Sequence, residues 1–209
     1  MKKYDLILAD APWQESNKSS NGAADNHYNT TDFYSLTRLP IEKIASDNSV
    51  LCMWYTGNFV REAYELAEAW GFKVRTGFGF VWVKLNKNAG DRIDKHPPED
   101  MFDFMDTLNA ETRINGGNQY RCNAEGCLIA TRGRGLERRS ASVRQIVYSC
   151  LGEHSEKPKE VHHRLEELYG DVPRIELFAR GKYGEWGVYG GQDKSDIQMR
   201  EFYSRYDRG

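Results

Sequence analysis

The sequence predicts a single α/β domain built on a mostly parallel β-sheet with helices on both faces. Its 209 residues are enough to bury one substantial core but too few for two large ones. Six short apolar runs are continuous rather than alternating, which is typical of strands covered on both faces. These runs cover residues 5–9, 50–54, 78–83, 126–131, 145–148 and 174–178. Helical patterns lie between them, and strands that alternate with helices favour a parallel sheet.

Two segments have the periodicity of amphipathic helices. The first covers residues 58–70, where Asn58 is suited to the N-cap and Gly71 to the position at which the helix ends. Its apolar stripe consists of Phe59, Ala63, Leu66, Ala67 and Trp70. The second covers residues 157–169 and ends at Gly170, with a proline near its first turn. Its apolar residues on one face are Val161, Leu165 and Leu168.

Two long segments interrupt this alternation. Residues 14–31 are polar and rich in Ser, Asn and Gly. Residues 86–121 form a long excursion in which we expect one short helix, around residues 99–108. Loops of this length are uncommon in compact domains and usually have a function. No repeat or change in composition divides the chain, so we expect residues 1–209 to form one domain.

Charge and hydropathy exclude several classes of protein. The net charge is −2 and the mean hydropathy is −0.74, which excludes a globally basic nucleic-acid binder. The longest apolar stretches have about five or six residues, far short of the roughly 20 that a membrane-spanning helix needs. Without a secretory signal pattern, we expect a cytoplasmic protein. We expect its four cysteines to be reduced and no metal site, since Cys122 and Cys127 lack the spacing of a zinc knuckle.

The tetrapeptide Asp10-Ala11-Pro12-Trp13 directly follows the first predicted strand. Ligands of open α/β sheets bind beyond the carboxyl ends of strands. A carboxylate, a backbone carbonyl fixed by proline and an indole face together suit the exocyclic amine of a flat base. The alternative is a turn at the end of a strand with a tryptophan that belongs to the core. The tetrapeptide alone does not decide between the two.

Further segments favour the functional interpretation. The tetrapeptide is similar to the Asp-Pro-Pro-Trp motif of the MT-A70 family of N6-adenine methyltransferases, and the chain resembles this family over most of its length. Other segments match in the same order: His27-Tyr28-Asn29-Thr30, Phe80-Val81-Trp82-Val83-Lys84, Arg121-Cys122-Asn123-Ala124-Glu125, Glu153-His154-Ser155-Glu156-Lys157-Pro158 and Arg174-Ile175-Glu176-Leu177-Phe178-Ala179-Arg180.

The resemblance implies a Rossmann-like S-adenosylmethionine-dependent methyltransferase with permuted motif order, in which the catalytic motif precedes the cofactor motifs. Lys157 would pair with the methionine carboxylate of the cofactor, Arg180 would reach its ribose and Gln192 its adenosine. The other implied cofactor residues are Asp10, His154, Ser155 and Phe178. The implied catalytic residues are Asp10, Ala11, Pro12 and Trp13, and Tyr28, Asn123 and Glu125 would contact the substrate base.

The expected reaction is methylation of adenine N6 in DNA, as in the compact bacterial and phage members that the chain resembles. Two alternatives stay open: methylation of adenosine in RNA, and a catalytically silent nucleic-acid-binding subunit. Two departures from the family pattern bear on activity, because Ala11 replaces the usual first proline and Gly191 a common asparagine. As partners we expect nucleic acid, DNA rather than RNA, with no membrane and with room for a homodimer.

Arginines are concentrated in one short stretch near residue 138. They are Arg132, Arg134, Arg138, Arg139 and Arg144. In a chain of net negative charge, such a stretch is a candidate for contact with phosphates. A solvated loop or a subunit contact is the alternative. We assign target recognition to residues 86–121.

Overall fold

The computed structural model describes residues 2–13, 33–114, 119–152 and 156–190. Seven strands are hydrogen bonded in the order β5-β3-β4-β2-β1-β6-β7. The pairs β1–β2, β1–β6, β6–β7 and β3–β5 are all parallel. The predicted α/β class with a mostly parallel sheet is therefore confirmed.

The chain separates into two compact units. The first unit comprises residues 1–77, 128–137 and 172–209, and the second comprises residues 78–127 and 138–171. Strands β3 (Lys73–Leu85) and β4 (Ala124–Arg132) each pass from one unit into the other.

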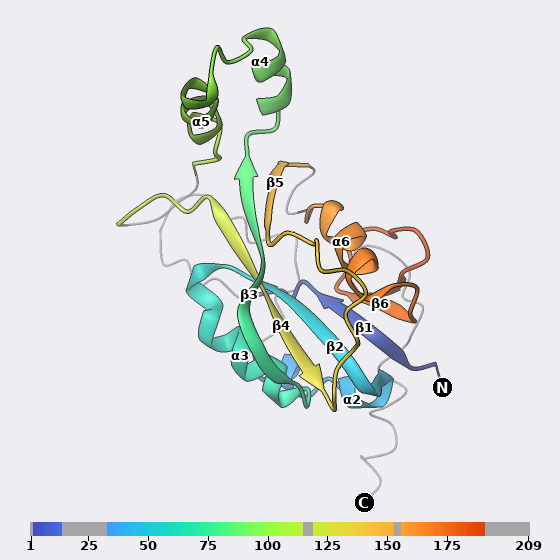
Figure 1. Ribbon diagram of the computed structural model, residues 1–209. Helices are drawn as coiled ribbons and strands as arrows, with labels where there is room; N and C mark the ends of the chain where they lie inside the picture. Colours follow the sequence, from blue (N-terminus) through green and yellow to red (C-terminus); the bar gives the residue numbers. More distant parts are fainter. Residues whose placement is uncertain (1, 14–32, 115–118, 153–155, 191–209) are drawn as a thin grey trace, which may run out of the picture. The chain divides into compact units, whose positions relative to one another are not determined.

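In the first unit, β1 (Tyr4–Ala9) lies between β2 (Ala45–Tyr55) and β6 (Arg174–Leu177), as Figure 1 shows. Strand β7 (Gly187–Tyr189) extends the sheet beyond β6. The helices of this unit are α1 (Phe33–Thr37), α2 (Ile41–Ile44), the short 3₁₀ helix η1 (Gly57–Phe59) and α3 (Val60–Ala69).

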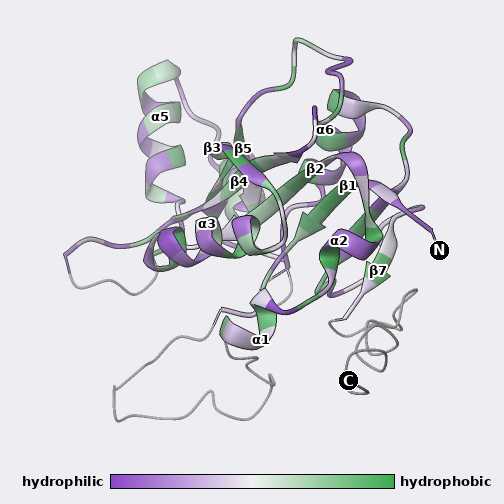
Figure 2. Ribbon diagram, turned by 90° about the horizontal axis from the view of Figure 1, so that it is seen from below, coloured by the Kyte–Doolittle hydropathy of each residue, from purple (hydrophilic) through white to green (hydrophobic). Residues whose placement is uncertain are grey.

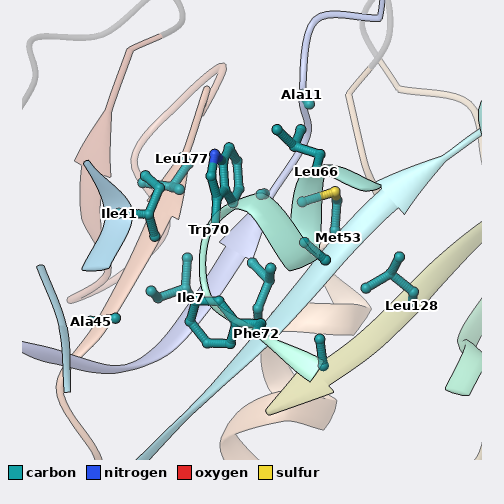
Figure 3. Packing of buried hydrophobic residues seen from close by; sticks show 14 of the residues in the cluster. Ile7, Ala11, Ile41, Ala45, Met53, Leu66, Trp70, Phe72, Leu128 and Leu177 are labelled. Atoms are coloured by element: carbon teal, nitrogen blue, oxygen red, sulfur yellow. The ribbon is translucent and has the colours of Figure 1, made fainter. Parts of the chain in front are cut away.

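Helix α3 forms the main core of this unit with the sheet. Its buried residues Ala63, Leu66 and Ala67 pack with Ile7 and Met53 from the central strands (Figure 3). The helix ends where Gly71 adopts a φ of +82°, a backbone conformation that favours glycine. Trp70 is fully buried, and its indole Nε1 donates to the Leu36 carbonyl at 2.8 Å, so its one polar atom is satisfied.

The second unit contains the distal part of β3, the start of β4, β5 (Ile146–Cys150) and α6 (Glu160–Tyr169). Strand β5 is an edge of the sheet. Arg164 of α6 donates through one nitrogen to the carbonyls of Arg144 and Ile146, at 2.7 Å each. Unpaired edge groups can template pairing with another chain, and Arg164 occupies the first acceptor of this strand and one acceptor just before it.

The excursion after β3 is more ordered than the sequence indicates. It contains α5 (Met101–Ala110), near the predicted helix, and also α4 (Ala89–Lys95), which extends with α5 from the end of β3 (Figure 1). Glu111 closes its base, because Arg92 Nε donates to this carboxylate at 2.6 Å and the Asn86 amide N–H to its carbonyl at 2.9 Å. The prediction of a single helix in residues 86–121 is therefore wrong.

Other predicted boundaries also shift. Helix α6 begins at Glu160 rather than at residue 157, because Pro158 and Lys159 lie in the turn before it. Helix α3 has Phe59 rather than Asn58 at its N-cap, because residues 57–59 form the 3₁₀ turn. Strands β2 and β3 extend beyond their apolar centres into polar residues, which the apolar runs do not mark.

Candidate active site

The predicted catalytic loop begins at the carboxyl end of β1, the strand from which the sheet extends in both directions. Ala9 is paired with Met53 of β2 on one side and with Leu177 of β6 on the other. The Asp10 amide donates to the Leu177 carbonyl at 3.3 Å, which continues the ladder by one residue. Ligands of open α/β sheets bind beyond the carboxyl ends of strands at which the chain connections on the two sides lead away in opposite directions, because these connections leave a crevice between them. The half-buried Asp10 follows directly at this position.

Pro12 is the centre of a three-residue turn. The Trp13 amide donates to the Ala11 carbonyl at 2.8 Å, the pattern of a γ-turn, whose common form needs a φ close to the value that proline fixes. Ala11 itself is buried, with 3% of its surface exposed. Its carbonyl therefore has a fixed direction and, since a carbonyl oxygen has two lone pairs, can accept one further hydrogen bond.

Trp13 is held by two contacts, one with β2 and one with the 3₁₀ helix that follows it. Its Nε1 donates to the Trp54 carbonyl at 3.1 Å. Its ring stacks on Phe59, with centroids 5.7 Å apart and an interplanar angle of 15°. The residue also packs against the core, so the structural interpretation of Trp13 is correct in part. One face of the indole is occupied by Phe59, which leaves only the opposite face for a planar ligand.

Phe178, directly after β6, has an unusual backbone. Its φ is +62°, and it is the one residue other than glycine with a positive φ in the part of the chain that the structure describes. Such conformations cost on the order of 1–3 kcal/mol and are concentrated at functional sites. The Phe178 amide donates to the Tyr189 carbonyl at 2.5 Å, and the two rings meet edge to face with centroids 6.2 Å apart. Arg180 follows, half-buried.

In the second unit, three charged side chains form a buried cluster, which we call the Lys84–Glu125–Lys157 triad. Lys84 Nζ is hydrogen bonded to Glu125 Oε1, and Lys157 Nζ lies 3.4 Å from Glu125 Oε2. The side chains of Lys84, Glu125 and Lys157 are 12%, 10% and 11% exposed. Two ammonium groups thus share one carboxylate, and the triad has a net charge of +1.

The carboxylate of the triad is ionised in spite of its burial. Burial has the largest single effect on Glu125 and would raise its pKa, but Lys157 and Lys84 together outweigh it and hold the pKa below the ordinary value of 4.5. Because Lys84 and Lys157 stabilise the negative form, the triad is an ion cluster and not a neutral hydrogen-bonded group.

Comparison with known proteins identifies the chain. The family model MT-A70 matches residues 4–192, which is most of the sequence. The chain belongs to the MT-A70 family. This is a family of S-adenosylmethionine-dependent methyltransferases, so the predicted family is confirmed.

Several members of the MT-A70 family align with the chain. It is 29% identical over 207 residues to the type II methyltransferase M.MunI of Mycoplasma sp, and the alignment covers 90% of this chain and 77% of that protein. It is 33% identical to the human N(6)-adenine-specific methyltransferase METTL4 and 22% identical to the human N(6)-adenosine-methyltransferase catalytic subunit METTL3. These alignments cover 91% and 85% of this chain, but only 38% of METTL4 and 26% of METTL3.

The structure distributes the predicted MT-A70 site residues unevenly. It brings Glu125 and Lys157 together, and it places Asp10 and Phe178 at the ends of neighbouring strands. Asn123, a predicted substrate contact, donates through its amide to the Thr112 hydroxyl at 3.1 Å and so supports the base of the excursion. Tyr28, His154, Ser155 and Gln192 lie outside the described residues.

The arginines of the stretch differ in their contacts and exposure, and they do not form one uniform surface patch. Arg132 donates to the Glu42 carbonyl at 3.2 Å, and the Arg134 amide is bonded to the Asn48 side chain at 2.9 Å, both within the first unit. In the second unit, the Arg139 backbone is fixed to the Leu168 carbonyl at 2.8 Å, while the residues Arg138 and Arg139 are exposed. Of these, Arg138 and Arg139 are the better candidates for contact with phosphates.

Two residues of this geometry were missed by the sequence analysis. Phe59 was expected in the core but forms the stacking platform for Trp13. Lys84 was noted only as the last residue of a family segment, and its position near the carboxyl end of a strand was the available signal. Among the described residues, no cluster of His, Cys, Asp or Glu is suited to a metal ion, and none of their helices is long and apolar enough to cross a membrane.

Proposed function

We propose that the chain transfers a methyl group from S-adenosylmethionine to the N6 amine of adenine in DNA. The observation that carries the proposal is the Asp10–Trp13 loop: a carboxylate at the carboxyl end of β1 is followed by a carbonyl that a γ-turn aims. DNA is favoured because the alignment covers most of M.MunI but about a quarter of METTL3. The sequence also resembles compact bacterial and phage members.

The chemistry of the adenine N6 amine explains why two hydrogen-bond acceptors, the Asp10 carboxylate and the Ala11 carbonyl, are needed. The N6 lone pair of adenine is delocalised into the ring, which makes the amine a weak nucleophile. Hydrogen bonds from the amine to the Asp10 carboxylate and the Ala11 carbonyl would localise that lone pair. They would also stabilise the positive charge that develops on nitrogen during transfer. The turn at Pro12 fixes the Ala11 carbonyl in advance, so little reorientation is needed at the moment of reaction.

The described residues also fit the cofactor. The triad, with a net charge of +1, suits the carboxylate of a methionine group, and Lys157 would hold it. The strained Phe178 and its partner Tyr189 offer aromatic surface next to the half-buried Arg180. When bound, S-adenosylmethionine supplies an electrophilic methyl group on a sulfonium. The residues of the chain would bind and orient the reactants, and Trp13 would flank the target base, which must leave the duplex to be reached.

Replacement of Asp10 tests the proposal. In Asp10→Asn, the side chain keeps its shape but loses its negative charge, so we expect methyl transfer to fall by at least about a hundredfold. Binding of S-adenosylhomocysteine should change much less. Transfer of tritium from labelled cofactor to adenine-containing DNA measures the first effect, and calorimetry measures the second. Asp47→Asn, at an exposed carboxylate of β2, is the matched control.

The substrates of the same assay separate the alternatives. Faster methylation of single-stranded RNA than of DNA would replace DNA by RNA in the proposal. A wild-type chain that binds S-adenosylhomocysteine but methylates neither polymer would indicate a catalytically silent subunit. An Asp10→Asn variant with near-normal turnover would remove Asp10 from catalysis.

A further inference from the structure

The triad contains one more positive group than the proposed carboxylate contact requires. Lys157 alone would provide a charge for an anionic ligand, but it lies 3.4 Å from Glu125. A buried lysine and a carboxylate that has no second cation beside it form a neutral ion pair. Such a pair would attract a ligand carboxylate much less than an uncompensated ammonium group.

Lys84 changes this balance because it has the closer contact with Glu125. It is hydrogen bonded to Oε1, whereas the 3.4 Å between Lys157 and Oε2 is long for a charge-assisted hydrogen bond. Lys84 is also well fixed. Its amide donates to the Asn123 carbonyl at 2.9 Å, its carbonyl accepts from the Arg113 amide at 2.7 Å, and its Nζ lies 5.2 Å from the centroid of the Trp82 ring.

We propose that Lys84 is a positioning residue that neutralises Glu125, so that this buried carboxylate competes less with the carboxylate of the cofactor for Lys157. The inference rests on the proposed function, which assigns that carboxylate to Lys157. Lys84 itself does not touch the reacting atoms. Its contribution is electrostatic, and the affinity for an anionic ligand should follow the net charge of the triad.

Three variants change that net charge in steps. Lys84→Met lowers it from +1 to 0, Glu125→Gln raises it to +2, and the double variant returns it to +1. We expect Lys84→Met to bind S-adenosylhomocysteine about tenfold more weakly than the wild type. A change of about tenfold is the lower limit of the effect expected when one charge-assisted contact is lost. The double variant should recover the wild-type affinity to within about threefold, and Glu125→Gln should bind at least as tightly as the wild type.

5′-Methylthioadenosine is the control ligand, because it lacks the carboxylate that the triad is proposed to hold and carries no charge in that part of the molecule. Calorimetric titration should give it similar affinities for the wild type and for all three variants. Lys84→Arg, which keeps the charge, should bind both ligands like the wild type. A thermal melt of each variant confirms that it is folded. If Lys84→Met does not fold, the double variant and Glu125→Gln still test the dependence on charge.

Two results would overturn the inference. One is equal weakening of both ligands by Lys84→Met, which indicates a structural role. The other is a double variant that binds S-adenosylhomocysteine no better than Lys84→Met. Failure of the cofactor assignment in the proposed function gives a different result, since the wild-type chain would then bind neither ligand, whereas a failure of methyl transfer alone leaves these titrations unchanged.

Discussion

At the scale of single residues, the proposed site depends on groups fixed in unfavourable states. Phe178 keeps a positive φ, and Glu125 stays ionised although it is buried. Both states have an energetic cost that neighbouring groups must offset. Such costs are expected where a chain must hold a ligand in one orientation.

The ionised state of Glu125 makes stability depend on pH. Its pKa is lower in the folded chain than its ordinary value of 4.5, so the unfolded state binds a proton first as the pH falls. The stabilisation is complete well above that value and is lost as the pH falls through the folded pKa. We expect the free energy of unfolding to fall more steeply below about pH 5 in the wild type than in Glu125→Gln.

Urea denaturation at a series of pH values measures this difference. The single variant Glu65→Gln is the control, because this carboxylate belongs to the exposed pair with Arg61, which is screened by solvent. If Glu125→Gln and the wild type lose stability in parallel below that pH, the carboxylate of the triad does not contribute to acid sensitivity.

At the scale of elements, continuous apolar runs made most of the sheet predictable. Strands β1, β4 and β6 lie close to their predicted positions because each contains a continuous run of at least three buried residues. Strand β7 was missed because three residues are too few for a periodic signal, and α4 because charged residues predominate in its sequence. The position of the catalytic loop was predictable because the motif Asp10-Ala11-Pro12-Trp13 marks it in the sequence. The contact between Lys84 and Glu125 joins residues 41 positions apart, and no local pattern encodes it.

Arg164 gives a prediction for the edge strand β5. In Arg164→Met, the carbonyls of Arg144 and Ile146 lose a charged donor, so we expect the free energy of unfolding to fall by about 2 kcal/mol. The exposed edge should also increase self-association. Urea denaturation and size-exclusion chromatography measure the two effects.

The control for this prediction is Arg61→Met, which removes an exposed i,i+4 pair with Glu65 on α3. Such pairs contribute at most a few tenths of a kcal/mol. Equal stability of the Arg164 and Arg61 variants would show that water replaces Arg164 at the edge without loss.

At the scale of the whole molecule, the chain combines parts with separable tasks. The excursion of α4 and α5 is closed at its base by Glu111, and α5 has no buried residue although it contains hydrophobic segments (Figure 2). Removal of such an element costs little buried surface. The remaining chain should therefore fold without it.

Replacement of residues 87–110 by an Asn-Gly turn tests the role of the excursion. Asn86 and Glu111 are already paired through the backbone, so a two-residue turn can join them. We expect binding of S-adenosylhomocysteine to persist and the choice of target sequence to relax or disappear. Methylation mapping of plasmid DNA is the measurement. Unchanged target sites would assign recognition to another part of the chain.

The exposed Arg138 and Arg139 should act on affinity rather than on sequence choice. Replacement of both by serine should weaken binding to all DNA sequences and reduce the salt slope of log affinity by about one unit per lost phosphate contact. Fluorescence anisotropy at several salt concentrations measures the slope. The control replaces Arg61 and Lys73, two other exposed cations, by serine. If both double variants keep the wild-type slope, Arg138 and Arg139 do not contact phosphates.

The stacked position of Trp13 makes the site visible to spectroscopy. All five tryptophans lie in the described residues, and Trp54, Trp70, Trp82 and Trp186 are buried to 98% or more. Trp13 is half-buried, so a soluble quencher such as acrylamide reaches its indole far more readily than the other four. A ligand that covers the face of this ring opposite Phe59 would protect it, and the quenchable fraction of the fluorescence would then report occupancy of the catalytic loop in the unmodified protein.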